Sequence, residues 1–210
     1  MTPCRTAAAL AVLALLCGAQ PALALTAELA GIGGTGIMLL EGEIEKGDAG
    51  RVERAIRKAG RVEEVWLDSE GGNLGEGLEL GRLLRRHGLS ARVPAEAVCA
   101  SACVYMLAGA PLRRVDEAGK VGVHMFTATG NAELVADVAR AVRENGPAVA
   151  AEVIRVIEQY SAGIAARQSA FLIEMSVSLQ VMTPSIGTAF DAIHWLTPAE
   201  LRRYNLVNTD

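Results

Sequence analysis

The sequence predicts one α/β domain built on a mostly parallel sheet, and three observations predict it. Between residues 37 and 126, short apolar runs alternate with stretches of helical spacing, which is the pattern of strand–helix–strand crossovers. The chain has 210 residues, which suits one domain of ordinary size and would be cramped for two. Its composition, 51% hydrophobic and 21% charged, excludes a disordered tail or a collagen-like repeat.

The elements can be assigned in chain order. Residues 25–36 are rich in Gly and Ala, and we expect them to form a loose lead-in to a single domain over 37–210. Strands are expected at 37–44, 62–67, 90–93, 97–100 and 121–126. Helices are expected at 49–59, 74–87 and 101–108, followed by two or three helices within 131–179. Thr197, Pro198 and Glu200 predict a short C-terminal helix that begins with a capping box.

The first 24 residues have the features of a secretory signal peptide. Arg5 is the one charged residue before Glu28, and it precedes an apolar run over residues 7–16 and the small-residue site Ala22-Leu23-Ala24. These features predict cleavage near Ala24 and a periplasmic or secreted mature protein. A membrane anchor is the alternative, but the run is shorter than the ~20 apolar residues that span a bilayer.

Charge and cysteine content narrow the partners further. The chain carries 20 Lys+Arg against 24 Asp+Glu, a net charge of -4 at pH 7, so it lacks the basic field that holds nucleic acid. Cys4 and Cys17 leave with the signal peptide, so Cys99 and Cys103 remain. Two cysteines without an adjacent His do not make the usual four-ligand zinc site, so we expect neither a metal nor another cofactor.

Three segments carry residues that are typical of acyl-transfer chemistry. Gly71 and Gly72 lie between a predicted strand and a predicted helix, where exposed backbone N–H groups can stabilise an oxyanion. Ser101 begins a predicted helix between two alanines, and His124 ends an apolar predicted strand. Each signal also has an ordinary structural explanation: a glycine turn, an N-cap serine and a histidine packed in the core.

Taken together, the three segments resemble the proteolytic subunit of Clp protease, within the ClpP/crotonase-like superfamily. The residues that carry the resemblance are Ser69-Glu70-Gly71-Gly72, Cys99-Ala100-Ser101-Ala102 and Gly122-Val123-His124. It covers residues 37–126 well and the tail from about 190 more faintly. The Cys-x-Ser-x-Cys pattern around Ser101 is similar to the pattern around the serine of exported bacterial Clp-like proteins. The resemblance implies a repeated ββα spiral with a mostly parallel sheet and a helical C-terminal part.

The resemblance also implies roles for individual residues. Ser101 corresponds to the nucleophile and His124 to the general base. The N–H groups of Gly72 and Ala102 correspond to the oxyanion hole, with Gly71 shaping the turn.

The third catalytic residue is less well defined by the resemblance, which places an orienting Asp shortly before the C-terminal helix. Asp191 is the nearest acid to that position, although the alignment of the tail falls on Ile193 instead. Glu158 and Glu174, on predicted helices, are weaker candidates, and His194 is expected to be structural.

Two further alternatives remain open. Some relatives use a Ser–Lys dyad, and Lys120 lies on the same side of its predicted strand as His124. A solvated Lys at a strand end is the competing interpretation. Cys99 and Cys103 bracket Ser101, and one helical turn would place their Cα atoms ~6 Å apart, within reach of a disulfide. Two free thiols packed as apolar residues would fit the sequence equally well.

The leading functional hypothesis is a serine hydrolase that acts on peptide or protein substrates, or on esters, through an acyl-enzyme. Because ATP is not expected outside the cytoplasm, no ATPase partner is expected. A crotonase-type acyl-CoA enzyme and a catalytically inactive scaffold protein are the alternatives. Related folds commonly form oligomers, and the apolar segment 148–182 would serve either as the contact surface of a homo-oligomer or as part of the core.

Overall fold

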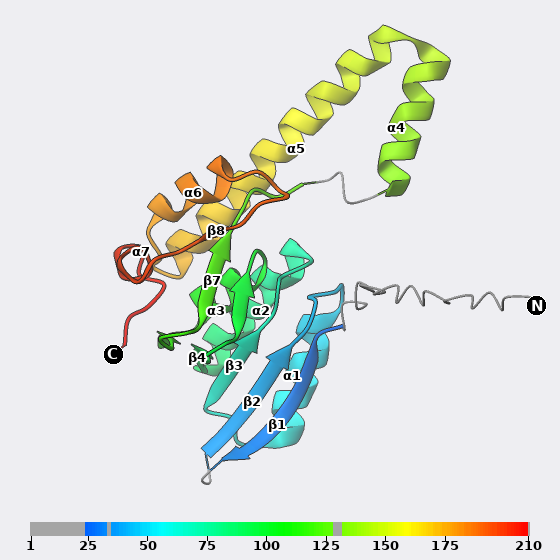
Figure 1. Ribbon diagram of the computed structural model, residues 1–210. Helices are drawn as coiled ribbons and strands as arrows, with labels where there is room; N and C mark the ends of the chain where they lie inside the picture. Colours follow the sequence, from blue (N-terminus) through cyan, green and yellow to red (C-terminus); the bar gives the residue numbers. More distant parts are fainter. Residues whose placement is uncertain (1–23, 33–34, 128–131, 210) are drawn as a thin grey trace, which may run out of the picture.

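The computed structural model describes residues 24–32, 35–127 and 132–209 (Figure 1). The expected signal peptide therefore lies outside the described residues, apart from Ala24, which forms an isolated bridge with Glu43. The described chain forms two sheets, helices that pack on them, and a helical C-terminal part.

The larger sheet has five strands in the order β1-β2-β3-β4-β6. Its strands are β1 (Thr26–Ile32), β2 (Thr35–Glu41), β3 (Glu64–Asp68), β4 (Ser90–Val93) and β6 (Arg113–Val115). Strand β1 is antiparallel to β2, and the other neighbours are parallel. Parallel neighbours need crossover connections, which helices supply here, so the predicted mostly parallel α/β sheet is confirmed.

The smaller sheet brings together the ends of two strands that the sequence analysis singled out. It contains β5 (Val98–Ala100), β7 (Lys120–Val123) and β8 (His194–Trp195), in the order β5-β7-β8. Strands β5 and β7 are parallel, and Ala100 is paired with Gly122. Ser101 and His124 therefore leave adjacent parallel strands at the same edge of this sheet.

The expected lead-in over residues 25–36 is wrong for most of its length, because it contains β1 and the start of β2. Strand β1 pairs with β2 from Thr26 opposite Glu41 to Ile32 opposite Thr35. Gly and Ala have low strand propensity, but the antiparallel ladder satisfies the backbone and overrides that weak local preference.

Three helices pack against the sheets. They are α1 (Asp48–Ala59), α2 (Leu74–His87) and α3 (Cys103–Gly109). In α2, four leucines are buried on one side, as predicted: Leu78, Leu80, Leu83 and Leu84. Helices α2 and α3 approach so closely that a Cβ on Gly81 would lie 2.3 Å from the Tyr105 carbonyl oxygen. This contact between α2 and α3 fixes the segment that follows Ser101.

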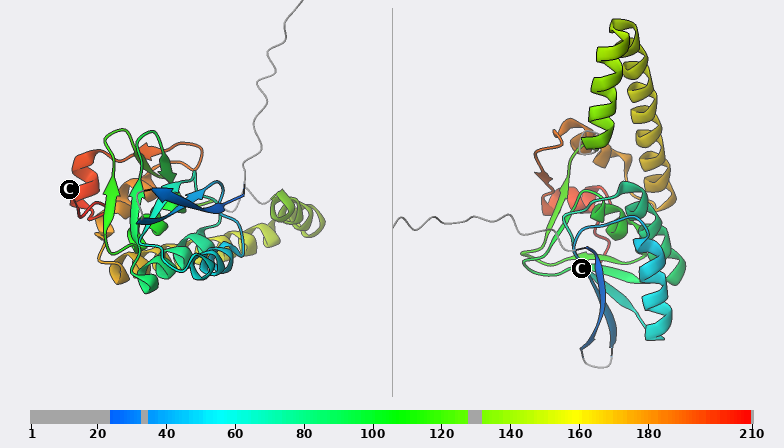
Figure 2. Two further views of the ribbon diagram at one scale, coloured as in Figure 1. Left: turned by 90° about the horizontal axis from the view of Figure 1, so that it is seen from below. Right: turned by 90° about the vertical axis from the view of Figure 1, so that its right-hand side faces the viewer.

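The C-terminal part is helical, as predicted. It contains α4 (Ala132–Asn145), α5 (Pro147–Glu174), the 3₁₀ helix η1 (Leu179–Val181), α6 (Met182–Gly187) and α7 (Pro198–Arg203). Helix α4 and residues 147–160 of α5 form a helical arm that projects away from the sheets in all three views (Figures 1 and 2). Beyond the arm, α5 returns to the core and buries Ile164, Phe171 and Leu172. Helix α7 begins with the predicted capping box.

Among the described helices, none has both the length and the apolar character required to cross a bilayer.

Candidate active site

The Gly71–Gly72 turn after β3 has a backbone that favours glycine. Both residues have positive φ angles, 106° and 130°, a region that side chains disfavour. A Cβ on Gly71 would also lie 2.7 Å from the Cβ of Ser101. The Gly71 N–H donates to the buried hydroxyl oxygen of Ser69 at 3.1 Å. Gly71 therefore shapes the turn and brings it against Ser101, while its own N–H is already engaged.

Ser101 occupies a strained turn between β5 and α3. Its φ is +54°, which is uncommon for a residue other than glycine and costs of order 1–3 kcal/mol. Its N–H donates to the carbonyl oxygen of Gly122 at 2.9 Å. Ala102, not Ser101, is the N-cap residue of α3, and no side chain caps that helix. The N-cap explanation for Ser101 is therefore wrong.

A disulfide joins Cys99 to Cys103 across this turn, with a Cα–Cα distance of 5.2 Å. The bond closes a loop of five residues that has Ser101 at its centre. Of the two alternatives that the sequence left open, the structure therefore contains the disulfide. Because both cysteines are fully buried, the bond is also enclosed by the core.

Two backbone N–H groups beside Ser101 remain available to a ligand. Neither the Gly72 nor the Ala102 N–H donates a hydrogen bond to any residue within the described ranges. Both residues line the same cavity as Ser101. The N-terminus of α2, at Asn73 and Leu74, lines it as well, and its helix dipole favours negative charge there. Such an arrangement suits an oxyanion.

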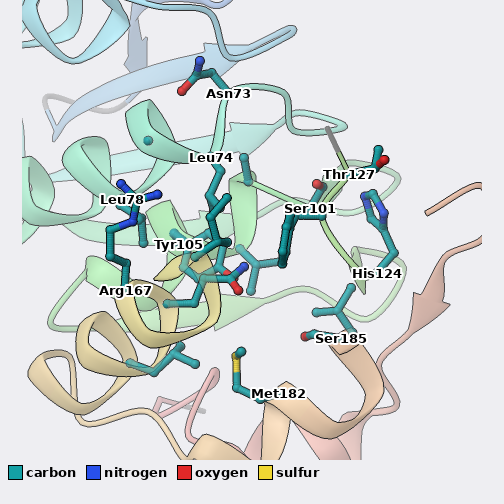
Figure 3. Close-up of a pocket in the computed structure, with 18 of the residues that line it drawn as sticks. Asn73, Leu74, Leu78, Ser101, Tyr105, His124, Thr127, Arg167, Met182 and Ser185 are labelled. Carbon is teal, nitrogen blue, oxygen red and sulfur yellow. The ribbon is translucent and has the colours of Figure 1, made fainter. Parts of the chain in front are cut away.

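His124 follows the last residue of β7 and lines the same cavity as Ser101. Figure 3 shows the imidazole of His124 and the hydroxyl of Ser101 toward the same end of this pocket. Within the described residues, the two groups are not hydrogen-bonded to each other, a contact that apo enzymes often complete only with substrate bound. The Nδ1 atom of His124 is buried and has no hydrogen-bond partner.

The structure does not bring the other candidate residues to this cavity. Asp191 is exposed, does not line the cavity and does not bond to His124. Lys120 is exposed and lies over the ring of Trp195, 6.0 Å from its centre. Glu174 pairs with Arg82 at 3.1 Å, and Glu158 is exposed on α5.

His194 lies in β8, and its side chain contacts Glu200 at the start of α7, as expected for a structural residue. Its Nε2 atom lies 3.1 Å from an Oε1 atom of Glu200. Hydrogen bonds from the backbone and side chain of Thr197, then from His194, lower the pKa of Glu200 to about 2. The carboxylate is therefore ionised at neutral pH and holds the capping box together.

The cavity has a volume of about 520 Å³. One wall comes from α2 and α3 and the opposite wall from α5, where the lining residues follow helical spacing: Tyr160, Ile164, Arg167, Gln168 and Leu172. Within it, the Gln168 side-chain amide donates to the Tyr105 hydroxyl at 2.7 Å, and burial raises the pKa of that phenol to about 12. Tyr105 is therefore a neutral part of the wall at any physiological pH.

The wall formed by α5 was not predicted from the sequence. Helices were expected in this region, but the sequence did not indicate which of their side chains would line a cavity. Spacing at 160, 164, 167, 168 and 172 was the available signal. It was not decisive, because the same spacing fits a helix that simply completes the core. Ser185, whose hydroxyl donates to the Val181 carbonyl oxygen at 2.8 Å, was also missed.

The described residues contain no group of three or more His, Cys, Asp and Glu side chains that could hold a metal ion. Both cysteines near the site are already joined to each other.

The fold defines a structural class: this chain has a ClpP-like α/β fold. No protein-family profile and no curated protein matches the sequence. Among solved structures, it is similar to a mutant of ClpP1 from Listeria monocytogenes, with 18% identity and a TM-score of 0.51, over 82% of this chain and 88% of that chain. It is also similar to a mutant of the 1510-N membrane-bound stomatin-specific protease, with 16% identity and a TM-score of 0.50, over 81% of this chain and 75% of that chain. At these identities the likeness establishes the fold.

Proposed function

We propose that this chain is an exported serine hydrolase that cleaves peptide bonds through an acyl-enzyme, without ATP. The observation that carries the proposal is one cavity lined by Ser101, by His124 and by the two free N–H groups of Gly72 and Ala102. A nucleophile, a base and oxyanion donors are the three parts that acyl transfer requires.

In the proposed mechanism, the Ser101 Oγ attacks the scissile carbonyl carbon while His124 takes the hydroxyl proton. The carbonyl oxygen becomes an oxyanion that accepts hydrogen bonds from Gly72 and Ala102. When the intermediate collapses, the C–N bond breaks and the amine leaves with the proton from His124. Water, deprotonated by His124, then attacks the ester and releases the acid and the free Ser101 hydroxyl.

The disulfide at the site supports the proposed location. Disulfides persist in oxidising compartments such as the periplasm and the extracellular space, and Cys99–Cys103 is buried within the fold. It is consistent with removal of the first 24 residues and with a periplasmic or secreted protein. Because ATP is not expected outside the cytoplasm, we propose that the protein has no ATPase partner and that its substrates are short, flexible or membrane-proximal peptides.

The helical arm supports the proposal of a homo-oligomer. It exposes large apolar side chains on both of its helices: Val135, Ile154, Val156, Ile157 and Tyr160. Exposed apolar groups that gather on one projecting element favour an intermolecular contact. Sedimentation of the mature protein at several concentrations would test this proposal, and a monomer throughout would contradict it.

A second candidate function is a binding protein that keeps the fold without catalysis. The observation that favours it is the unpartnered Nδ1 of His124, because hydrolases of this type orient the imidazole with a third group.

A fluorophosphonate probe separates the two functions. We expect it to label residues 25–210 of the wild type at Ser101, as located by peptide mass mapping, and to leave the folded Ser101→Ala variant unlabelled. We also expect an unfolded substrate such as casein to be degraded without nucleotide. A correctly folded wild type that neither reacts with the probe nor degrades casein would establish the binding protein instead.

A further inference from the structure

The cavity extends well beyond the groups that the proposed chemistry uses. In Figure 3, Ser101 and His124 lie at one end of the pocket and Arg167 at the other, with Leu74 and Tyr105 between them. A volume of about 520 Å³ accommodates a substrate segment of several side chains. The side chains at the far end therefore bear on which substrates fit.

Arg167 is the one permanently charged side chain among the described residues that line the cavity, and no Asp or Glu lines it. Its guanidinium forms no ion pair or hydrogen bond with the described part of the chain. By contrast, Arg155 on the same helix pairs with Glu152. The cavity therefore has a positive end without an internal counter-ion, which complements a negatively charged ligand.

The region between the two ends is mainly apolar. Leu74 and Leu78 contribute one wall and Ile164 the other. The polar pair in this region, Gln168 and Tyr105, is hydrogen-bonded to itself. A group that fills this region is therefore expected to be apolar, and a charged group is favoured only where it reaches Arg167.

We propose that the cavity selects substrates in which an apolar segment next to the scissile bond is followed by a carboxylate, and that Arg167 is the specificity-determining residue that binds this carboxylate. A guanidinium suits the role because its planar N–H groups can donate two parallel hydrogen bonds to one carboxylate. The catalytic part of this inference rests on the proposed function, whereas the binding part does not. The carboxylate comes either from a peptide C-terminus or from a Glu or Asp side chain.

The experiment measures charge discrimination in two arms. The first arm compares internally quenched peptides that end in a free acid with the same peptides ending in an amide. The second compares peptides that carry one Glu, at successive positions around an apolar residue, with the same peptides carrying Gln. Each pair is tested for cleavage by the wild type and for binding to the Ser101→Ala variant by fluorescence anisotropy.

The matched variants lie on one helix. In the wild type we expect the anionic member of one arm to be preferred about 2- to 5-fold, the range for an ion pair with an exposed side chain such as Arg167. The preference should fall to about 1 in Arg167→Gln and invert in Arg167→Glu. Arg155→Gln, which removes an arginine of α5 outside the cavity, should keep the wild-type preference. Thermal melts confirm that the exposed substitutions leave the protein folded.

Each outcome is informative. Discrimination in the first arm identifies the C-terminal carboxylate, and discrimination in the second identifies the acidic side chain. No discrimination in either arm, with Ser101 labelled by the fluorophosphonate, overturns the role of Arg167 and leaves the hydrolase intact. Discrimination in binding to Ser101→Ala, with no labelling of the wild type, keeps the anionic site and overturns the hydrolase.

Discussion

The segments that carry the two proposed catalytic groups are held in different ways. The Ser101 turn is fixed by a hydrogen bond from the Ser101 N–H to the Gly122 carbonyl oxygen, by the disulfide across the turn and by close contact with Gly71. His124 follows the end of β7, and the Nδ1 atom of its ring has no partner. The fold therefore fixes the position of Ser101 and of the Gly71–Gly72 turn beside it. In contrast, no hydrogen bond at Nδ1 fixes the orientation of the His124 imidazole.

The largest effect is expected from removing the imidazole. His124→Ala should slow fluorophosphonate labelling of Ser101 by about 10²- to 10⁴-fold, the usual contribution of a general base. The fold should remain, because the ring holds no structural hydrogen bond at Nδ1. His194→Ala is the matched control, since His194 lies beside Glu200 outside the cavity. An equal loss of labelling in both variants would contradict a specific role for His124.

The next effect concerns the nucleophile turn. Gly71→Ala places a Cβ within 3 Å of Ser101, of the Ala100 carbonyl oxygen and of the Ala102 nitrogen, at a φ of +106°. Strain and overpacking should together lower the free energy of unfolding by about 3 kcal/mol or more. Urea unfolding followed by circular dichroism measures it.

The control for this change is Gly163→Ala on α5, where a Cβ meets nothing within 4 Å. Its helical position should make the variant more stable by about 0.5–1 kcal/mol. If Gly71→Ala were as stable as this control, the close contact between the two turns would not be a constraint on the fold.

A smaller effect is expected from opening the disulfide. Closing a loop of five residues stabilises a fold by about 2 kcal/mol in the chain-entropy treatment, so Cys99→Ala/Cys103→Ala should lose about that much. Wild type in reductant should unfold at the denaturant concentration of the variant, and the variant itself should not respond to reductant. Equal stability of wild type with and without reductant, with the bond shown to be reduced, would mean that the turn is held without it.

The smallest effect is expected at Asp191. Because Asp191 is exposed and makes no bond to His124, Asp191→Asn should change the labelling rate of Ser101 by less than about twofold. A loss near 10⁴-fold, the scale on which an orienting carboxylate acts, would restore Asp191 as the third catalytic residue. It would also show that the His124 segment, like the Ser101 turn, is held in place by specific contacts.

Much of the fold could be predicted because its signals are local. Helix α2 has the predicted bounds, residues 74–87, since its leucines follow helical spacing and Gly88 ends it with a left-handed φ. Strands β1, β6 and β8 were not predicted. Strand β8 has two residues and exists through its pairing with β7, and such long-range pairing leaves little trace in a short segment of sequence.

The residues of the candidate site likewise divide into those that could be predicted from the sequence and those that could not. Ser101, Gly72 and His124 could be identified because their order and spacing along the chain match a known arrangement. The position of Asp191 could not be derived, because the tail reaches β7 through the short strand β8 rather than through a recognisable motif. Arg167 gave no signal, since an arginine on a helix is ordinary until the cavity beside it is known.

Helix α5 is one continuous helix from the projecting arm to the cavity wall. Its 28 residues at ~1.5 Å each make a rod about 42 Å long. Tyr160, Ile164 and Leu172, all on the cavity wall, therefore belong to the same rigid body as the exposed end. A load applied to that distant tip by any neighbouring molecule would tilt the wall and change the width of the cavity.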